Sequence, residues 1–206
     1  MRTQKERMEA GDLFLPDDPE FARMNRRNRL LVKEFNQTTV DELDQRSELL
    51  CNLIPNIGKQ AYIEPPFYCE YGNYIKTGDN FFANLDCIFM DIAPITIGHN
   101  VLIGPRVGIY TANHPLDVDV RSKGVEYGQA VTIGDNVWIG AGAILNPGVT
   151  IGSNTVIGSG AVVTKDIPDN VLAAGNPCQV IRTIGEEDHI KWQRRLDDYL
   201  EEMGPL

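Results

Sequence analysis

The sequence lacks any apolar run long enough to span a membrane, and its first ten residues lack the apolar stretch of a secretory signal. We therefore expect a cytoplasmic protein that makes no membrane contact. Cations are also scarce, because 19 Lys and Arg stand against 29 Asp and Glu and give a net charge of −10. Proteins that bind duplex nucleic acid usually present a basic face, so nucleic acid is not an expected partner. A few local Lys or Arg side chains are still enough to bind the phosphates of an anionic ligand.

Cysteine is scarce as well. The four cysteines form neither a CxxC pair nor a cluster with the spacing of a metal site. We interpret them as free thiols in a reducing compartment. They are Cys51, Cys69, Cys87 and Cys178.

What the sequence does contain is a period of six residues. It runs through ITIGHN and VLIGPR (95–106) and again from VTIGDN to AVVTKD (131–166). Residues two apart in a strand point the same way, so each hexad supplies two inward side chains and then a turn rich in Gly, Asn and Asp. The spacing fits neither a 3.6-residue helical period nor ordinary hairpins. Three flat faces per coil predict a triangular parallel β-helix, with aliphatic inward positions at Ile97, Ile103, Ile109, Ile133, Ile139, Leu145, Ile151, Ile157 and Val163.

A weaker form of this pattern extends towards the N-terminus. Ile63, Cys69, Ile75, Phe81 and Cys87 lie six residues apart, and the register slips between Cys87 and Ile97. We therefore expect the prism to cover residues 61–182.

The two flanks are predicted to be helical. Residues 1–60 contain expected helices at 20–35 and 38–54, the second opening with a Thr cap. Residues 183–206 contain a charged helical stretch at 186–203. Because solenoids need their open ends covered, we expect both flanks to cap the prism.

Between the two runs of hexads, residues 113–130 form an excursion with no repeat signature. A long loop inside a strict repeat is often functional. His114 opens this loop, and Pro115 restricts its backbone to an extended form. His99 is interpreted as a turn residue and His189 as a surface residue. Neither completes a histidine cluster with His114, so no metal site is expected.

Several segments resemble the maltose and galactoside O-acetyltransferases, a branch of the hexapeptide-repeat acyltransferases. They are KERMEAGDLF (5–14), EFN (34–36), YIEPPFYCEYG (62–72), NFFAN (80–84), YTANHP (110–115), VTIGDNVWIGAGAILNPGVTIG (131–152) and VVTKDIPDNVLAAGNPCQVI (162–181). The resemblance covers nearly the whole chain up to Arg182. It implies a left-handed β-helix, acetyl-coenzyme A as co-substrate, a sugar acceptor, and a homotrimer with active sites between subunits.

The resemblance also implies roles for single residues. His114 corresponds to the general base that activates an acceptor hydroxyl for direct attack on the thioester. Asn84, Asp91 and Glu70 fall on acceptor positions, although Glu70 replaces a small hydroxyl residue of galactoside-type members. Asp17 matches an acidic acceptor position only if a gap is allowed.

The cofactor positions follow in the same way. A backbone N–H at Ala141 or Gly142 is the implied oxyanion donor. Ser159, Thr164, Lys165 and Arg182 fall on coenzyme A positions, while Gln179 replaces a basic one.

Other functions remain open at this point. The hexad core also resembles nodulation, serine and antibiotic acetyltransferases, so the acceptor is not fixed. A zinc carbonic anhydrase on the same fold is weakened by the missing histidine cluster, and a non-catalytic scaffold would not depend on His114.

Overall fold

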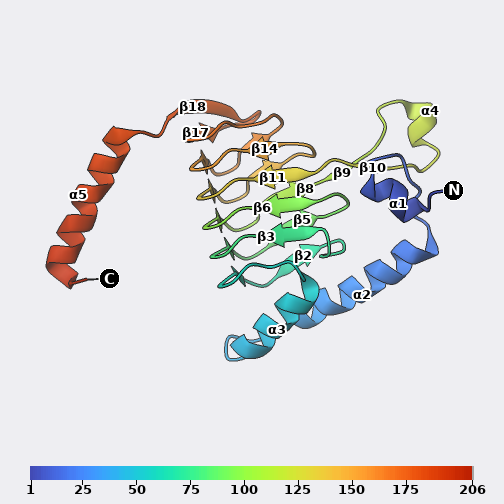
Figure 1. The fold of residues 1–206 in the computed structure, drawn as a ribbon, viewed down its shortest axis with the longest axis horizontal. Coiled ribbons are helices and arrows are strands. Elements are labelled where there is room, and N and C mark those ends of the chain that lie inside the picture. Colours follow the sequence, from blue (N-terminus) through green and yellow to red (C-terminus); the bar gives the residue numbers. More distant parts are fainter. Residues whose placement is uncertain (206) are drawn as a thin grey trace.

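The computed structural model describes residues 1–205. Short strands stack into a prism that runs vertically in Figure 1, with helices at its N-terminal end and one helix apart from it. The helices are α1 (Gln4–Glu9), α2 (Pro19–Asn36), α3 (Leu43–Leu53), α4 (Val118–Arg121) and α5 (Glu186–Met203). The strands are β1 (Tyr62–Ile63), β2 (Phe67–Cys69), β3 (Ile75–Thr77), β4 (Phe82–Ala83), β5 (Cys87–Met90), β6 (Ile95–Ile97), β7 (Leu102–Ile103), β8 (Gly108–Tyr110), β9 (Ala112–Asn113), β10 (Tyr127–Gly128), β11 (Val131–Ile133), β12 (Trp138–Ile139), β13 (Ile144–Leu145), β14 (Thr150–Ile151), β15 (Val156–Ile157), β16 (Val162–Val163), β17 (Val171–Ala174) and β18 (Gln179–Thr183).

Three sheets form the faces of the prism. Face 1 contains β1, β4, β7, β12, β15, β17 and β18; face 2 contains β2, β5, β8, β13 and β16; and face 3 contains β3, β6, β11 and β14. Strands pair in parallel within each face, except that β18 runs antiparallel to β17. The fold is the predicted left-handed parallel β-helix of hexapeptide repeats, with a helical N-terminal region and a C-terminal helix.

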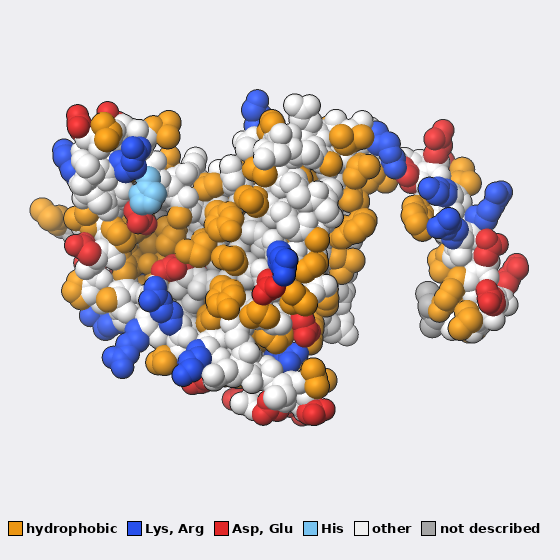
Figure 2. Space-filling model, turned by 180° about the vertical axis from the view of Figure 1, so that it is seen from behind, with side chains coloured by type: hydrophobic (Ala, Val, Ile, Leu, Met, Phe, Trp, Pro, Cys, Tyr) orange, Lys and Arg blue, Asp and Glu red, His pale blue; other side chains and the backbone are white. Residues whose placement is uncertain are grey.

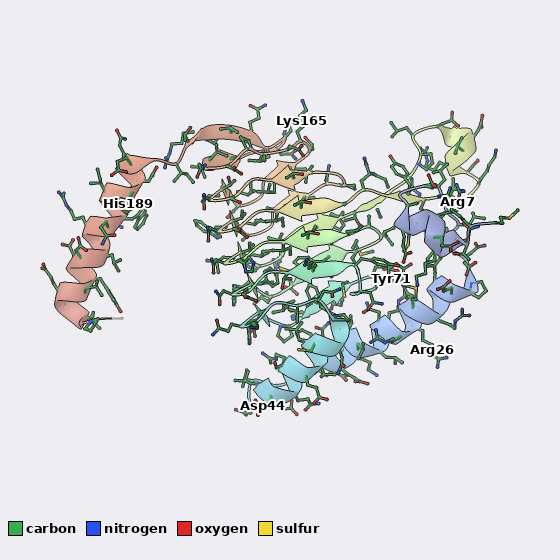
Figure 3. The ribbon with its side chains drawn as sticks, viewed as in Figure 1. Arg7, Arg26, Asp44, Tyr71, Lys165 and His189 are labelled. Atoms are coloured by element: carbon green, nitrogen blue, oxygen red, sulfur yellow. The ribbon has the colours of Figure 1, made fainter. Side chains whose placement is uncertain are left out.

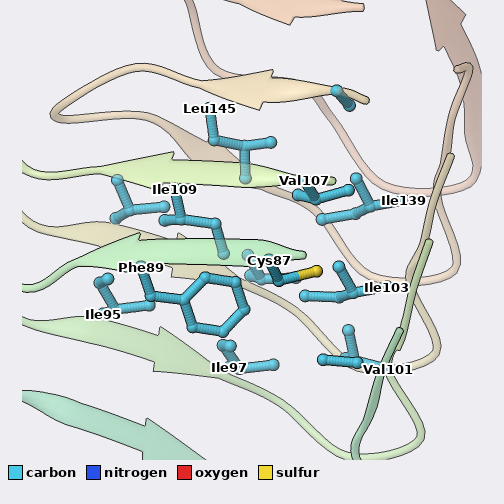
Figure 4. Packing of buried hydrophobic residues seen from close by; sticks show 14 of the residues in the cluster. Cys87, Phe89, Ile95, Ile97, Val101, Ile103, Val107, Ile109, Ile139 and Leu145 are labelled. Atoms are coloured by element: carbon cyan, nitrogen blue, oxygen red, sulfur yellow. The ribbon is translucent and has the colours of Figure 1, made fainter. Parts of the chain in front are cut away.

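The core lies inside the prism and follows the predicted inward positions. On face 2, Phe89 pairs in register with Ile109, which pairs with Leu145, and all three are buried. Figure 4 shows these aliphatic and aromatic side chains stacked in layers, with the Cys87 thiol among them. Each coil therefore buries its apolar side chains against the coils above and below, which is the main stabilising contribution in such a fold.

The early coils are longer than the hexad period predicts. Ile63 pairs with Ala83, and Ala83 with Ile103, so each of these coils contains 20 residues. In later coils, Asn136 and Asn154 lie 18 residues apart, and Asn154 and Asn170 lie 16 apart. The slip expected between Cys87 and Ile97 is present, and another lies between Cys69 and Ile75. The additional residues fall at the corner between faces 2 and 3.

Asparagines line the corner between faces 3 and 1. Their backbones adopt positive φ values between 55° and 58°, which asparagine tolerates better than most residues. Each side-chain amide donates to the side-chain carbonyl of the next, at 2.9 to 3.0 Å. His99 belongs to the same corner, where its Nδ1 accepts from the Asp79 N–H, in agreement with a turn residue. The ladder consists of Asn80, Asn100, Asn136, Asn154 and Asn170.

At the N-terminal end, α2 and α3 cover the prism through Val32, Phe35, Leu50 and Leu53. The helix expected at 38–54 begins later, at Leu43, and has no Thr cap. The reason is that the Thr38 and Thr39 carbonyls accept from the buried Arg46 side chain, which holds this segment as a turn.

The C-terminal helix α5 has the predicted bounds but does not cap the prism. It stands beside the coils, and all its residues are exposed or half-buried (Figure 1). The antiparallel hairpin of β17 and β18 forms that end of the prism instead. No helix in residues 1–205 has both the length and the apolar character needed to cross a membrane.

Candidate active site

The excursion leaves the prism at the corner between faces 2 and 3. Its ends pair as an antiparallel ribbon of β9 and β10, and His114 follows β9 directly. Arg121 of α4 donates to the carbonyls of Pro115 and Leu116, which fixes the loop beyond the histidine. The backbones of Phe14 and Glu126 exchange two hydrogen bonds of 3.0 Å, so the N-terminal segment is tied to the excursion.

His114 faces an acidic side chain. Its Nε2 lies 4.0 Å from Oε1 of Glu126. The imidazole remains about half exposed, whereas the Glu126 side chain is 23% exposed. A histidine placed in this way can take a proton from a ligand while its positive form stays close to a carboxylate.

A cleft of about 870 Å³ opens beside this pair, between α2, the N-terminal segment and the corner of the prism. Figure 2 shows the region as a hollowed, mostly apolar surface bordered by charged side chains and a histidine. Its lining combines an aromatic and aliphatic floor, two carboxylates and a cationic rim from α2. The lining residues are Phe14, Pro16, Phe21, Ala22, Asn25, Arg26, Arg29, Leu30, Lys33, Glu70, Tyr71, Met90, Ile92, Ala112, His114 and Glu126.

Glu70, for which the family resemblance implies contact with the acceptor, lines this cleft. Asn25 of α2 donates a hydrogen bond to its carboxylate, and Asn28 donates to its backbone carbonyl. Burial raises the pKa of the Glu70 carboxyl, while Arg29 and the Asn25 hydrogen bond lower it. The carboxylate is therefore held in a defined position as a potential acceptor for ligand hydroxyls.

Asp91 does not have the predicted position. It is fully buried below the cleft, where its carboxylate accepts backbone N–H bonds from Glu70, Tyr71 and Tyr74 at 2.8 to 3.3 Å. Burial raises the pKa of Asp91 to about 6, and these backbone hydrogen bonds oppose the shift. The next residue, Ile92, lines the cleft instead. Asp91 thus shapes the lengthened corner that presents Glu70 and Tyr71.

Four predicted site residues lie together on another corner, between faces 1 and 2. Asn84 follows β4, Ala141 and Gly142 follow β12, and Ser159 follows β15. The Gly142 N–H donates to the Pro105 carbonyl at 2.9 Å, so it is not the free oxyanion donor that was expected as one option. Among the backbone bonds of residues 1–205, none engages the Ala141 N–H, which leaves Ala141 as the candidate.

The predicted phosphate-binding residues are separated. Thr164 and Lys165 are exposed after β16, on the His114 corner but near the C-terminal end of the prism, far from Arg26 of α2 (Figure 3). Arg182 of β18 forms two hydrogen bonds of 2.6 and 2.8 Å with the Asp188 carboxylate at the start of α5. Its guanidinium is therefore already paired within the chain. Asp17 is exposed beside the cleft, next to the lining residue Pro16.

Sequence reasoning missed Glu126, Asn25 and Arg29. Glu126 lies in the same excursion as His114, and that common location was the available signal. Asn25 and Arg29 are on α2, one helical turn apart, and only tertiary packing brings them to Glu70. A group of three or more His, Cys, Asp or Glu side chains able to hold a metal ion is absent from residues 1–205.

Comparisons with known proteins agree with this architecture. A family model described as bacterial transferase hexapeptide (six repeats) matches residues 130–165, and one described as maltose acetyltransferase hexapeptide capping motif matches residues 7–58. Galactoside O-acetyltransferase of Escherichia coli K12 is 44% identical over 183 residues, which cover 89% of this chain and 90% of that protein. Nodulation protein L of Rhizobium meliloti is 45% identical over 179 residues, which cover 87% of this chain and 98% of that protein.

Solved structures are similar over the same extent. A maltose O-acetyltransferase from Clostridium difficile 630 superimposes with a TM-score of 0.88 at 49% identity, covering 90% of this chain and 99% of that one. A galactoside acetyltransferase in complex with coenzyme A gives a TM-score of 0.89 at 43% identity, covering 92% and 94%. The chain belongs to the hexapeptide-repeat acetyltransferases of the maltose and galactoside O-acetyltransferase family.

Proposed function

We propose that this acetyltransferase moves the acetyl group of acetyl-coenzyme A to a hydroxyl of a sugar of the maltose, glucose or galactoside type, with His114 as general base. The observation that carries the proposal is the position of His114 over the cleft with Glu126 behind it. Similarity to a galactoside acetyltransferase solved with coenzyme A supports the choice of donor.

His114 and Glu126 perform the proton chemistry. The imidazole accepts the proton of the acceptor hydroxyl as the oxygen attacks the acetyl carbon, and the carbon–sulfur bond of the thioester then breaks. The Glu126 carboxylate lies 4.0 Å from the imidazole, where it faces the positive charge that develops on His114 during proton transfer. The imidazolium can then return its proton to the leaving thiolate, which restores the neutral base.

The cleft chemistry fits a sugar. Pyranose rings have apolar faces that suit the apolar lining of the cleft, while their hydroxyls need fixed acceptors such as Glu70. Asp17 is proposed to approach the acceptor from the rim. Because Asp91 is buried, we assign it to positioning of the corner and not to acceptor contact.

The second corner fits a long, thin ligand such as the pantetheine arm of coenzyme A. A Cβ atom added at Gly142 or Gly160 would meet nothing within 4 Å, so the corner between faces 1 and 2 borders open space. Ala141 and Ser159 are small, exposed residues on this corner. The Ala141 N–H would stabilise the oxyanion, and Lys165, with Thr164 beside it, would meet phosphates. Arg182 would join them only if its pairing with Asp188 opened.

These two corners belong to different edges of one prism, so a single chain does not bring Asn84 and Ala141 to His114. The outer surface of the prism indicates how they meet. Face 1 carries outward Leu102 and Trp138, both more than half exposed, and face 2 carries outward Tyr68, Ile88 and Ile144.

Face 3 is different, because its outward residues are polar. They are Lys76, Thr96, Thr132 and Thr150. A prism with two apolar faces and one polar face is suited to a closed ring in which face 1 of each copy packs on face 2 of the next. We propose a homotrimer of this kind, in which a neighbour supplies Asn84, Ala141 and Ser159 to the His114 corner.

A coenzyme A release assay tests the proposed function. Acetyl-coenzyme A would be supplied with a panel of maltose, glucose, galactosides, chitin oligosaccharides, serine and hydroxylated antibiotics, and free thiol would be measured. We expect turnover with simple sugars that disappears in His114→Ala. Preferred turnover with an oligosaccharide, serine or antibiotic would reassign the acceptor, and a lack of any His114-dependent turnover would favour a scaffold role.

A further inference from the structure

The C-terminal helix α5 presents an apolar seam that its own chain leaves uncovered. Trp192, Leu196, Tyr199 and Met203 follow one another at spacings of four, three and four residues, which places them on one side of the helix. Each of them is exposed, with Trp192 at 57%. Isolated helices of this length are marginal in water, so a helix of this composition is expected to be stabilised by packing against another surface.

The charges of α5 restrict the partner. After Arg195 the helix carries Asp197, Asp198, Glu201 and Glu202 and no further cation up to its last residue, Met203. The seam is therefore bordered by carboxylates in its C-terminal half. A matching surface should combine apolar side chains with cations.

The surface of α2 next to the rim of the cleft has this combination, and Arg26 and Leu30 belong to both. Arg23, Arg26 and Arg27 surround Leu30 and Leu31 in a shallow groove of about 590 Å³ between α2 and α3. Leu30, which lines this groove, is more than half exposed. Over its whole length α2 carries five cations against two carboxylates, so its charge is opposite to that of the end of α5.

The arrangement of the elements brings these surfaces together between copies. α2 is attached to face 2, because Asn28 and Asn36 bond the backbone of β2. α5 continues from β18 of face 1 and descends, apart from the coils, to the level of the helices at the N-terminal end (Figure 1). If face 2 of a neighbour packs on face 1, the α2 of that neighbour would enter the space beside α5.

We propose that α5 of one copy packs on a second copy of this chain, with its apolar seam docked into the groove beside α2 of that copy. The inference rests on the proposed packing of face 1 on face 2. It adds a contact beyond the prism walls, which holds neighbours together through complementary charge and buried Trp192 and Leu196.

Cysteine cross-linking tests the contact directly. Cys51, which is exposed, is first replaced by Ser. One chain then carries Leu30→Cys and a second, differently tagged chain carries Leu196→Cys, and the two are co-expressed and mildly oxidised. Both native side chains are exposed, so folding should persist. We expect disulfide-linked pairs of the two different chains in at least fivefold excess over pairs of identical chains.

The other outcomes are equally informative. Disulfide-linked pairs of two Leu196→Cys chains would show that α5 helices contact one another and would overturn the proposal. A cross-linked monomer from a chain carrying both substitutions, or no cross-link at all, would also overturn it. The mass of the same samples in solution distinguishes failure of the contact between α5 and α2 from failure of the packing of face 1 on face 2. A trimer without the mixed cross-link would reject only the contact between the helices. A monomer would reject the packing of the faces as well.

A charge swap gives an independent test. Asp197→Lys with Asp198→Lys should raise the subunit dissociation constant at least tenfold at low ionic strength, and the effect should fade at 1 M salt because salt screens exposed charges. Adding Arg23→Glu with Arg27→Glu in the same chain should restore tight assembly. Failure of either the loss or the rescue contradicts the proposed partner surface.

Discussion

The Nε2 of His114 lies 4.0 Å from Oε1 of Glu126, and the backbone of Glu126 is bonded on both sides to Phe14 of the N-terminal segment. The excursion, the N-terminal segment and the histidine are thereby held as one unit at the edge of the cleft. The partner of the imidazole is a residue of the same loop, twelve positions further along the chain. Positioning of His114 therefore depends on closure of this loop against the prism.

His114→Ala should lower kcat by about 10²–10⁴-fold, because it removes the proposed general base for the acceptor hydroxyl. The side chain is about half exposed, so thermal stability and assembly should change little. Steady-state kinetics with the best acceptor, together with differential scanning calorimetry, measures both effects. Near-normal turnover of the variant would require a different base.

Glu126→Gln should lower kcat by roughly ten- to a hundredfold, as expected when a carboxylate that supports a catalytic histidine is neutralised. The bonds to Phe14 are backbone bonds and should persist, so the melting temperature should be maintained. Glu70→Gln serves as the matched control in the same cleft. It should act mainly on the KM of the acceptor, and equal kinetic effects of the two variants would refute the separate roles.

Asp91→Asn should change how stability depends on pH. Burial raises the pKa of Asp91 from 3.8 to about 6, so the folded protein holds this proton more tightly than the unfolded chain. The resulting stability is fully present below pH 4 and is lost as pH rises through 6, with a magnitude of roughly 2–3 kcal/mol. Urea unfolding at pH 4 and pH 7 should show this loss in the wild type beyond that of the variant. Identical pH dependence in the two proteins would contradict the assignment.

Lys165→Ala should raise the KM for acetyl-coenzyme A and leave the KM of the acceptor nearly unchanged, because a charge-assisted phosphate contact contributes on the order of 1–3 kcal/mol. Arg182→Ala should have a smaller effect on the KM for acetyl-coenzyme A, since Asp188 already binds that guanidinium. Initial-rate measurements with each substrate varied in turn distinguish the two residues. A larger effect of Arg182 than of Lys165 would mean that the Asp188 pair opens in the complex.

Trp138→Glu should dissociate the proposed trimer, because it places a charge in the apolar outer surface of face 1. Thr132→Glu, on the polar face 3, is the control and should leave assembly intact. Mass photometry at nanomolar concentration gives the oligomeric state of both. If the two variants assemble alike, face 1 is not an interface.

Much of the prism could be predicted from sequence because its physics is local and repeated. Ile103, Ile109 and Ile139 face inward as the hexads indicate, and the break after Ala112 marks the excursion that carries His114. The burial of Asp91 could not be predicted, since it depends on the residues that lengthen one corner. The pairing of Arg182 with Asp188 and the docking of Asn25 on Glu70 also could not, because they join segments whose relative placement no repeat determines.

The lengths of the coils have a consequence for how this chain can vary. Hydrogen-bonded corner residues on successive coils lie 16, 18, 20 or 36 positions apart, and every one of these intervals is even. Side chains alternate between the two sides of a strand, so a single added residue would turn the following strand inside out, whereas a pair preserves it. Only insertions of an even number of residues therefore keep the apolar side chains of the next strand in the core. The corner from which residues 113–130 leave the prism has two additional residues in each of two coils and the whole excursion in a third, and the aliphatic side chains of these coils still lie in the core.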